Sequence, residues 1–248
     1  MSKLGDRIRK ASRVEPAPMG FAAAAAQAAA PSMLVVVRLG SDAGKAADAI
    51  AKGADVVLME VDAGKLRAAK LPDGAIVGVA AGDVKLEDAV ALREAGADFL
   101  VIDGGSRGEA LLDEKLGFVM SVSADEEDTK LRLLGELSLD TLLVKEVETP
   151  VSVAGMLSLR RLASFVRAPL LVEIDAKADA GLLHLLRDAG AIGVVVPAAD
   201  IGNLAELRER IAGIPVRGRK REEPHAEPLV PAQAMSGGHD EDDDYDDD

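Results

Sequence analysis

The chain has 248 residues, of which 48% are hydrophobic and only 2% aromatic, and its net charge is −14. It contains no cysteine, which excludes disulfides and thiolate chemistry and fits a reducing cytoplasm. The few aromatic side chains and the acidic balance argue against binding to nucleic acid, which relies on stacking platforms and basic surfaces.

Residues 1–30 predict a flexible N-terminal extension. Their basic start predicts an amphipathic helix, and the alanine-rich stretch that follows predicts a second, short helix outside the core. A signal peptide is the alternative, but Asp6, Glu15 and two prolines precede the alanines and Gln27 interrupts them. No other segment has the ~18 apolar residues that a membrane span requires, so we expect no membrane partner.

From residue 31 to residue 214, short apolar runs alternate with helical patterns. The runs are nearly continuous, which is typical of strands that are buried on both faces in a parallel sheet. We expect strands at 33–39, 55–61, 75–81, 98–104, 117–123, 141–147, 169–175 and 192–198.

Helical patterns fill most of the gaps between these strands, and several end in glycine, the residue favoured just beyond a helix. The phrase Gly-Ala-Asp at 53–55 recurs at 96–98, each time between a helix and the next strand. The stretches 62–70 and 104–116 are weaker helix candidates, because the first is short and the second opens with glycines. Helices are expected at 42–53, 85–96, 128–137, 152–166, 178–190 and 203–213.

Eight strand–helix units, each about 20 to 29 residues apart, predict a (β/α)8 barrel over residues 31–214. The alternative is a doubly wound open parallel sheet. Its usual G-x-G-x-x-G turn after the first strand is missing from "RLGSDAGKAA" (38–47), so we favour the barrel.

Residues 215–248 predict a disordered tail. After Pro215, basic residues and three further prolines without an apolar period lead into "HDEDDDYDDD" (239–248), which holds eight acidic residues. Without these eight the net charge is −6, so the acidity is mainly a property of the tail. Such a run is usually solvated, and contact with a basic partner is the alternative.

Charged side chains gather at the ends of the predicted strands and are absent from the early, apolar part of each. In barrels the active site lies at the C-terminal strand ends, where a charge is solvated or paired rather than buried in a dry interior. We therefore expect a polar, ligand-binding mouth there. The residues at these ends are Arg38, Glu60, Asp103, Lys145, Glu146, Glu173 and Asp175, with Ser121 and Ser123 on the fifth strand and Asp83 beyond the third.

Lys145 is the candidate nucleophile or base. His184 falls in a predicted helix and the two other histidines fall in the tail, so acid–base chemistry is left to carboxylates and lysine. Asp103 and Glu173 are the candidate proton shuttles. Because side chains alternate along a strand, only one of Lys145 and Glu146 can point into the barrel, and the role of the lysine depends on which.

Several residues could bind the ligand. Arg38 can hold a carboxylate or phosphate bidentately, and Glu60 and Ser121 complete the predicted mouth. The loop "DGGSRG" (103–108), with its backbone N–H groups, Ser106 and Arg107, predicts an anion cradle. The carboxylates would also suit Mg²⁺, without a compact ligand motif to support it, and no other cofactor is expected. The four carboxylates concerned are Glu60, Asp103, Glu173 and Asp175.

The chain resembles the broad superfamily of (β/α)8-barrel class I aldolases and phosphate-binding barrels. The resemblance rests on the eight units and on the phrase "AGAD-x-x-x-ID" at 95–103. It implies a Schiff-base lysine on the sixth strand, which matches Lys145 in "LLVKEV". The chain departs from the pattern after the seventh and eighth strands, where the glycines of the usual phosphate site are missing.

These features together predict an enzyme of the lyase, aldolase or isomerase type that acts on a small anionic carbonyl metabolite. The alternative is a barrel without catalysis, a scaffold or ligand-binding protein whose disordered tails carry the function. An assembly of identical chains is compatible with the sequence.

Overall fold

The computed structural model describes residues 2–12, 33–69, 71–145 and 147–215. The chain divides into a unit of Met1–Val216 and a second unit of Arg217–Asp248. The predicted alanine-rich helix, Glu146 and the predicted tail lie outside the described residues. Everything below concerns the first unit.

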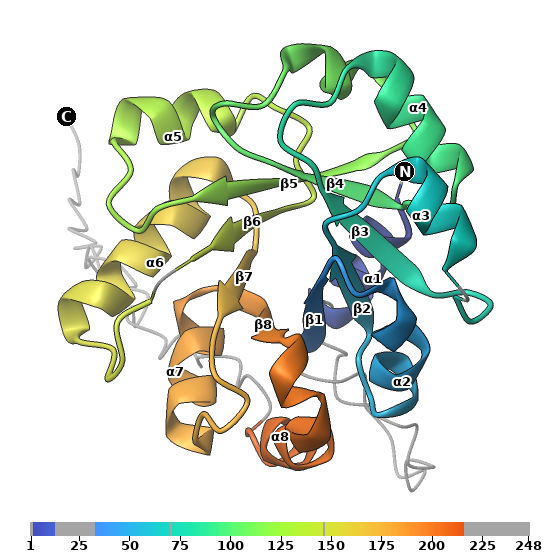
Figure 1. Ribbon diagram of the computed structural model, residues 1–248. Coiled ribbons are helices and arrows are strands. Elements are labelled where there is room, and N and C mark those ends of the chain that lie inside the picture. The colour runs from blue at the N-terminus through green and yellow to red at the C-terminus, as the bar shows by residue number, and fades with distance from the viewer. Residues whose placement is uncertain (1, 13–32, 70, 146, 216–248) are drawn as a thin grey trace, which may run out of the picture. The chain divides into compact units, whose positions relative to one another are not determined.

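Eight parallel strands close into a barrel in the order of the sequence (Figure 1). Strand β1 pairs with both β2 and β8, which excludes the open sheet and confirms the (β/α)8 barrel. All eight predicted strands are confirmed. They are β1 Leu34–Gly40, β2 Val56–Met59, β3 Ile76–Ala80, β4 Phe99–Ile102, β5 Gly117–Val122, β6 Thr141–Val144, β7 Leu170–Glu173 and β8 Ala191–Pro197.

Helices cover the outside of the barrel, and each of the six predicted helices is confirmed. The weak candidate at 62–70 also forms a short helix, because Asp62 caps it by accepting the Lys65 N–H at 2.9 Å. The helices are α2 Ala46–Ala51, α3 Ala63–Ala68, α4 Leu86–Glu94, α5 Asp128–Leu134, α6 Val153–Val166, α7 Ala180–Ala189 and α8 Leu204–Ala212.

The connection after β4 contains no α-helix in its described residues and forms only a 3₁₀ turn, Gly108–Leu112. Its glycines disfavour helix, and Asp103 and Ser106 organise the preceding residues into a hydrogen-bonded turn. The prediction of a helix at 104–116 is therefore wrong. A compact loop instead borders the C-terminal end of the barrel on this side.

Alternate residues of each strand divide the core into two layers. One set packs outward against the helices, and the other fills the barrel interior with apolar side chains. The strand residues of the inner cluster are Leu34, Val36, Val56, Leu58, Ile76, Phe99, Val101, Val119, Leu143, Leu171, Ile192 and Val195.

A helix near the N-terminus, α1 (Lys3–Ser12), closes the N-terminal end of the barrel. Its apolar residues Leu4 and Ile8 are buried within the inner cluster, and the helix contacts β5 and β8. In Figure 1 it lies behind the strands. The sequence correctly predicts this basic amphipathic helix but does not predict where it packs.

Three aspartates hold α1 in place, and each directly precedes an even-numbered strand. Asp55 pairs with Arg7, and Asp98 accepts the Lys3 and Leu4 N–H groups, each at 2.8 Å. Asp140 accepts the Ser2 hydroxyl. The Gly-Ala-Asp repeat thus has a structural use, since Asp55 and Asp98 are its acidic residues.

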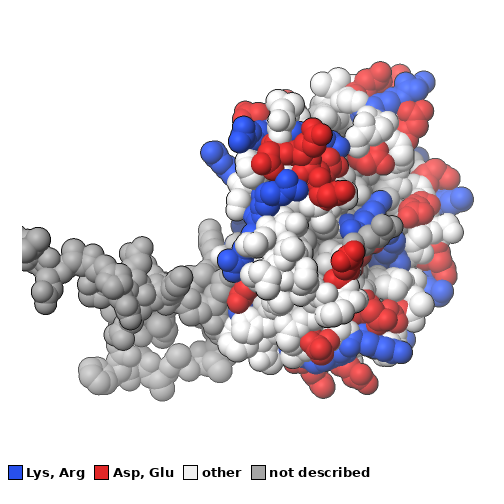
Figure 2. Space-filling model, turned by 90° about the vertical axis from the view of Figure 1, so that its left-hand side faces the viewer, with Lys and Arg blue, Asp and Glu red and all other residues white. Residues whose placement is uncertain are grey.

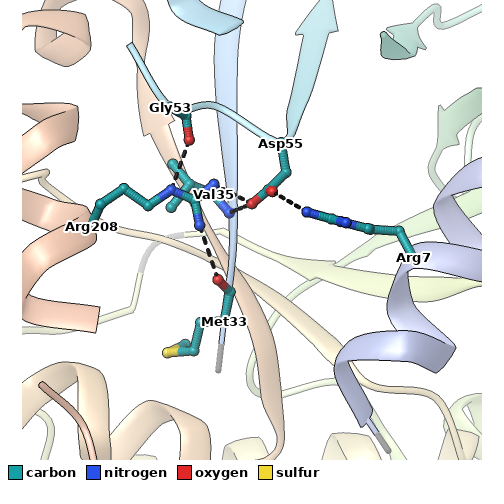
Figure 3. Close-up of polar contacts among 6 residues, drawn as sticks. All are labelled: Arg7, Met33, Val35, Gly53, Asp55 and Arg208. Atoms are coloured by element: carbon teal, nitrogen blue, oxygen red, sulfur yellow. Dashed lines mark hydrogen bonds and ion pairs between the residues drawn. The ribbon is translucent and has the colours of Figure 1, made fainter. Parts of the chain in front are cut away.

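Asp55 also anchors the last helix. Figure 3 shows its carboxylate between Arg7 and Arg208, where it also accepts the Val35 N–H at 2.9 Å. Arg208, on α8, donates to the carbonyl oxygens of Gly53 at 2.7 Å and Met33 at 3.4 Å. One carboxylate therefore connects α1, β1, β2 and α8 at the end of the barrel away from the mouth.

The surface carries charges of both signs. Figure 2 shows acidic and basic side chains interspersed around a largely uncharged area on the side of the molecule that carries α6 and α7. The described residues on this side form no continuous basic surface of the kind that binds nucleic acid. None of the helices in the described ranges is both long and apolar enough to cross a bilayer.

Candidate active site

Six polar side chains have the inward-facing register at the C-terminal end of the barrel. Each lies two residues beyond a side chain of the inner cluster, so the alternation of the strand turns it toward the barrel axis. They are Arg38, Glu60, Asp103, Ser121, Lys145 and Glu173, which follow Val36, Leu58, Val101, Val119, Leu143 and Leu171. The register places Lys145 on the inward side; Glu146 itself is outside the described residues.

One part of the mouth is a pocket of about 270 Å³, called here the lysine pocket. Its polar lining residues are Glu60, Asp103, Ser106, Ser121 and Lys145, and the segment after β3 supplies a wall of small residues. Within the described part of the chain, no carboxylate forms an ion pair with Lys145. The structure therefore brings four predicted site residues together around the amine of Lys145, which forms no ion pair with the described residues. The four are Glu60, Asp103, Ser106 and Ser121.

A second pocket of about 360 Å³, the arginine pocket, lies at the ends of β1, β7 and β8. Arg38 and Glu173 line it and form an ion pair through Nη2 and Oε1, with side chains 28% and 24% exposed. The pair spans β8, which lies between β7 and β1 in the sheet. The segment after β6 joins the two pockets, because Lys145 lines the first and Val147 the second.

The ion pair does not satisfy the guanidinium fully. The Nε atom of Arg38 and the Oε1 atom of Glu173 are both buried, and neither has a hydrogen-bond partner among the described residues. A buried donor without an acceptor costs free energy that an additional acceptor would recover. The contact with Glu173 is thus an ion pair without a well-aligned hydrogen bond, and the edge of Arg38 formed by Nε and Nη2 is available to another acceptor.

The predicted anion cradle at 103–108 is occupied by the protein itself. The Gly105 N–H donates to the Asp103 carboxylate at 2.9 Å, and the Ser106 hydroxyl accepts the Asp103 N–H at 3.0 Å. The Gly105 N–H, one of the backbone donors of the predicted cradle, is therefore already used within the loop.

Arg107 lies outside the residues that line the lysine pocket. It forms a two-point ion pair with Asp83 beyond β3, with Nη2 and Oδ2 3.2 Å apart. The hydrogen bond from Arg107 lowers the pKa of Asp83, and the same contact raises the pKa of Arg107. The pair joins the loops after β3 and β4. The position of Arg107 therefore does not support the expected role in ligand binding.

The turn after β7 is also internally satisfied. The Asp175 side chain accepts the Lys177 N–H at 2.7 Å, and its carbonyl accepts the Ala178 N–H at 3.0 Å. The Ala176 N–H donates to Asp200 at 3.4 Å. These backbone donors are not directed at a ligand, in agreement with the absence of glycines after this strand.

The carboxylates proposed for magnesium are divided between the two pockets. Glu60 and Asp103 line the lysine pocket, whereas Glu173 and Asp175 line the arginine pocket. In the ranges that the structure describes, no three acidic or histidine side chains are grouped closely enough to hold a metal ion. The Mg²⁺ alternative therefore gains no ligand cluster from the fold.

His184 is a surface residue of α7, as its sequence position predicts. Its Nε2 atom lies 3.4 Å from Asp188 Oδ2, one turn further along the same helix. It does not line either pocket of the mouth.

Solved structures with a similar fold are barrel proteins. A tryptophan synthase structure from M. tuberculosis has a TM-score of 0.59 at 14% identity, covering 85% of this chain and 97% of that chain. Thiamine phosphate pyrophosphorylase from Pyrococcus furiosus has a TM-score of 0.55 at 18% identity, covering 76% and 98%. A mutant tryptophan synthase alpha-subunit from Pyrococcus furiosus has a TM-score of 0.55 at 10% identity, covering 72% and 96%.

No protein-family model matches the chain, and no curated protein matches it. At 10% to 18% identity the similarity to solved structures shows the fold, a (β/α)8 barrel, and not the reaction.

Proposed function

We propose that the protein is a small-metabolite enzyme of the lyase, aldolase or isomerase type. Its substrate would be an anionic carbonyl compound bound at the C-terminal ends of the strands. The observation that carries the proposal is the position of Lys145, which has the inward register and shares a pocket with Glu60, Asp103 and Ser121. Catalytic groups of barrel enzymes come from the ends of several different strands at this face.

The proposed chemistry begins with attack of the neutral Lys145 amine on the carbonyl carbon of the substrate. A proton delivered by Asp103 to the hydroxyl of this adduct releases it as water and leaves an iminium ion, which withdraws electrons from the neighbouring C–C or C–H bond. Asp103 would move protons within the lysine pocket, and Glu173 would do so from the arginine pocket. Glu60 and Ser121 would bind polar groups of the substrate, and Arg38 its anionic group.

Pocket size and the comparisons support a small substrate. Cavities of about 270 and 360 Å³ suit a compact metabolite. The similar solved structures include proteins named as a synthase and a pyrophosphorylase, which supports a barrel enzyme in general terms. A chain without cysteine suits a reducing compartment, and we place its activity in the cytoplasm.

Borohydride trapping tests the proposal. The full chain is incubated with a panel of 2-oxo acids and sugar phosphates and reduced, and the modified lysine is located by peptide mass spectrometry. We expect an adduct at Lys145 that Lys145→Met abolishes. Lys130→Met should leave the adduct unchanged, because Lys130 lies on α5 in an ion pair with Glu126, outside both pockets. Absence of an adduct at Lys145 with every compound would refute the Schiff-base mechanism.

A ligand-binding protein without catalysis is the second candidate. The ion pair between Arg38 and Glu173 favours it, because paired charges at a barrel mouth can be structural. Binding of a carboxylate without any lysine adduct or turnover would support this candidate over the enzyme.

A further inference from the structure

The ion pair between Arg38 and Glu173 places a carboxylate of the protein against the guanidinium that is proposed to bind the ligand. We propose that Glu173 occupies, in the free protein, the site where Arg38 binds the carboxylate of a ligand, and that a bound carboxylate displaces it. This inference rests on the proposed function for the class of ligand, and it identifies that class as carboxylates rather than phosphate esters.

The contact between the two side chains is incomplete in a way that favours exchange. Nη2 of Arg38 forms an ion pair with Oε1 of Glu173, yet among the described residues neither this Oε1 nor the neighbouring Nε of Arg38 has a hydrogen-bond partner. A planar carboxylate can accept from Nε and Nη2 together, in the bidentate arrangement that arginine prefers. An incoming carboxylate therefore gains hydrogen bonds to Arg38 that Glu173 does not make.

Space for the exchange exists beside the pair. Both side chains line the arginine pocket of about 360 Å³, and both are partly exposed, so the Glu173 carboxylate can rotate into water without leaving a charge in the dry interior. The displaced carboxylate remains next to the ligand. Displacement thus places Glu173 where it can accept a proton from the bound molecule.

The surroundings favour a carboxylate over a phosphate ester. Asp175 lines the same pocket, and a second carboxylate repels a dianion more strongly than a monoanion. Phosphate sites in barrels use free backbone N–H groups after β7 and β8. Here the N–H groups of Ala176, Lys177 and Ala178 already donate to acceptors of the protein.

Calorimetric titration of the full chain with pyruvate and with inorganic phosphate tests the inference. Glu173→Gln should bind pyruvate about tenfold more tightly than the wild type, the gain expected when only about one molecule in ten otherwise presents a free guanidinium. Glu173→Ala should give the same gain, and Arg38→Met should abolish binding. Phosphate should bind more weakly than pyruvate in each variant that keeps Arg38.

Asp175→Asn is the matched control, since it removes one negative charge from the same pocket without touching Arg38 and keeps an oxygen for the Lys177 N–H. An equal gain in Asp175→Asn, no gain in either Glu173 variant, absence of binding throughout, or tighter binding of phosphate would each overturn the inference. Repeating the titrations in the Lys145→Met background removes Schiff-base formation. A gain that persists there would stand even if trapping at Lys145 fails.

Discussion

Arg7 and Asp55 are joined by an ion pair with Nη2 and Oδ1 2.9 Å apart, which fastens the N-terminal helix to the start of β2. The Asp55 side chain is only 7% exposed, and it also pairs with Arg208 of α8. The two ends of the barrel therefore differ. At the N-terminal end the charges of Arg7, Asp55 and Arg208 are paired and stabilise the fold, whereas at the mouth Lys145 forms no ion pair with the described residues.

Asp55→Asn should lower the free energy of unfolding substantially. The substitution keeps the shape of the side chain but removes the charge that compensates two guanidinium groups. We expect a loss of roughly 2–3 kcal/mol, below the value for a fully buried pair because the Arg7 side chain is 42% exposed. Urea unfolding measures it. Asp48→Asn, which breaks an exposed i,i+4 pair with Lys52, should cost less than about 0.5 kcal/mol; equal losses would contradict the assignment.

Leu4 should contribute to the stability of the barrel although it lies outside the eight strand–helix units. Its side chain is fully buried in the inner cluster, so Leu4→Ala leaves a cavity at the barrel floor. A loss of about 3 kcal/mol in the free energy of unfolding is expected. Leu112→Ala, at an exposed site, should cost under about 0.5 kcal/mol. If removing the Leu4 side chain changes stability no more than this control does, α1 is not part of the core.

The buried Asp113 and the half-buried Asp140 should give opposite pH dependences. Burial raises the pKa of Asp140 above its ordinary value of 3.8, against the hydrogen bond from Ser2 and with added repulsion from Asp98. Its charged form therefore destabilises the fold as the pH rises above 3.8 toward the raised pKa. Burial also opposes ionisation of Asp113, but hydrogen bonds from Arg93 and Lys115 outweigh it and lower its pKa. The stability that Asp113 supplies is present above 3.8 and is lost as the pH falls toward the lowered pKa.

Urea unfolding of Asp140→Asn and Asp113→Asn between about pH 3 and 7 measures both effects. Relative to the wild type, Asp140→Asn should gain stability as the pH rises above 3.8. The deficit of Asp113→Asn should shrink as the pH falls below 3.8. Parallel curves for the two variants would show that the two carboxyl groups do not differ in this way.

The sequence predicts the barrel well because its decisive features are local. A continuous apolar run of about seven residues is sufficient to predict a buried parallel strand, and glycines punctuate the helix ends. The exception is the stretch after β4, where hydrogen bonds from Asp103 and Gly105 produce a turn in place of a helix. The position of α1 is not predictable in this way, because Asp98 and Asp140 come next to residues 2–4 only after the barrel has closed.

In the candidate site, too, local sequence patterns predict some features and miss others. The position of Arg38 and Glu173 at the ends of predicted strands leads to the expectation that both lie at the mouth, but it does not indicate that they pair across β8. For Arg107 composition alone is misleading. A basic residue in a glycine-rich loop resembles an anion site, yet Arg107 is paired with Asp83 on the neighbouring loop. Pairings between distant strand ends require the strand order and the loop conformations, which local patterns do not specify.

Gly78 and Phe99 should be energetically coupled inside the barrel. The Phe99 ring occupies the space next to Gly78 on the adjacent strand, so a Cβ at residue 78 would overlap the ring. Gly78→Ala should therefore destabilise the protein by about 1–3 kcal/mol through overpacking. Gly82→Ala is the matched control, because nothing lies within 4 Å of a Cβ at that position.

The double variant Gly78→Ala/Phe99→Leu tests the cause. A smaller side chain at residue 99 makes room for the new methyl group, so the loss in the double variant should be smaller than the summed losses of the single variants by about 1 kcal/mol or more. Urea unfolding of the four proteins gives this coupling energy directly. Additive losses would mean that Gly78 is required for a reason other than the Phe99 ring, and the interior packing of the barrel at this level would then need a different explanation.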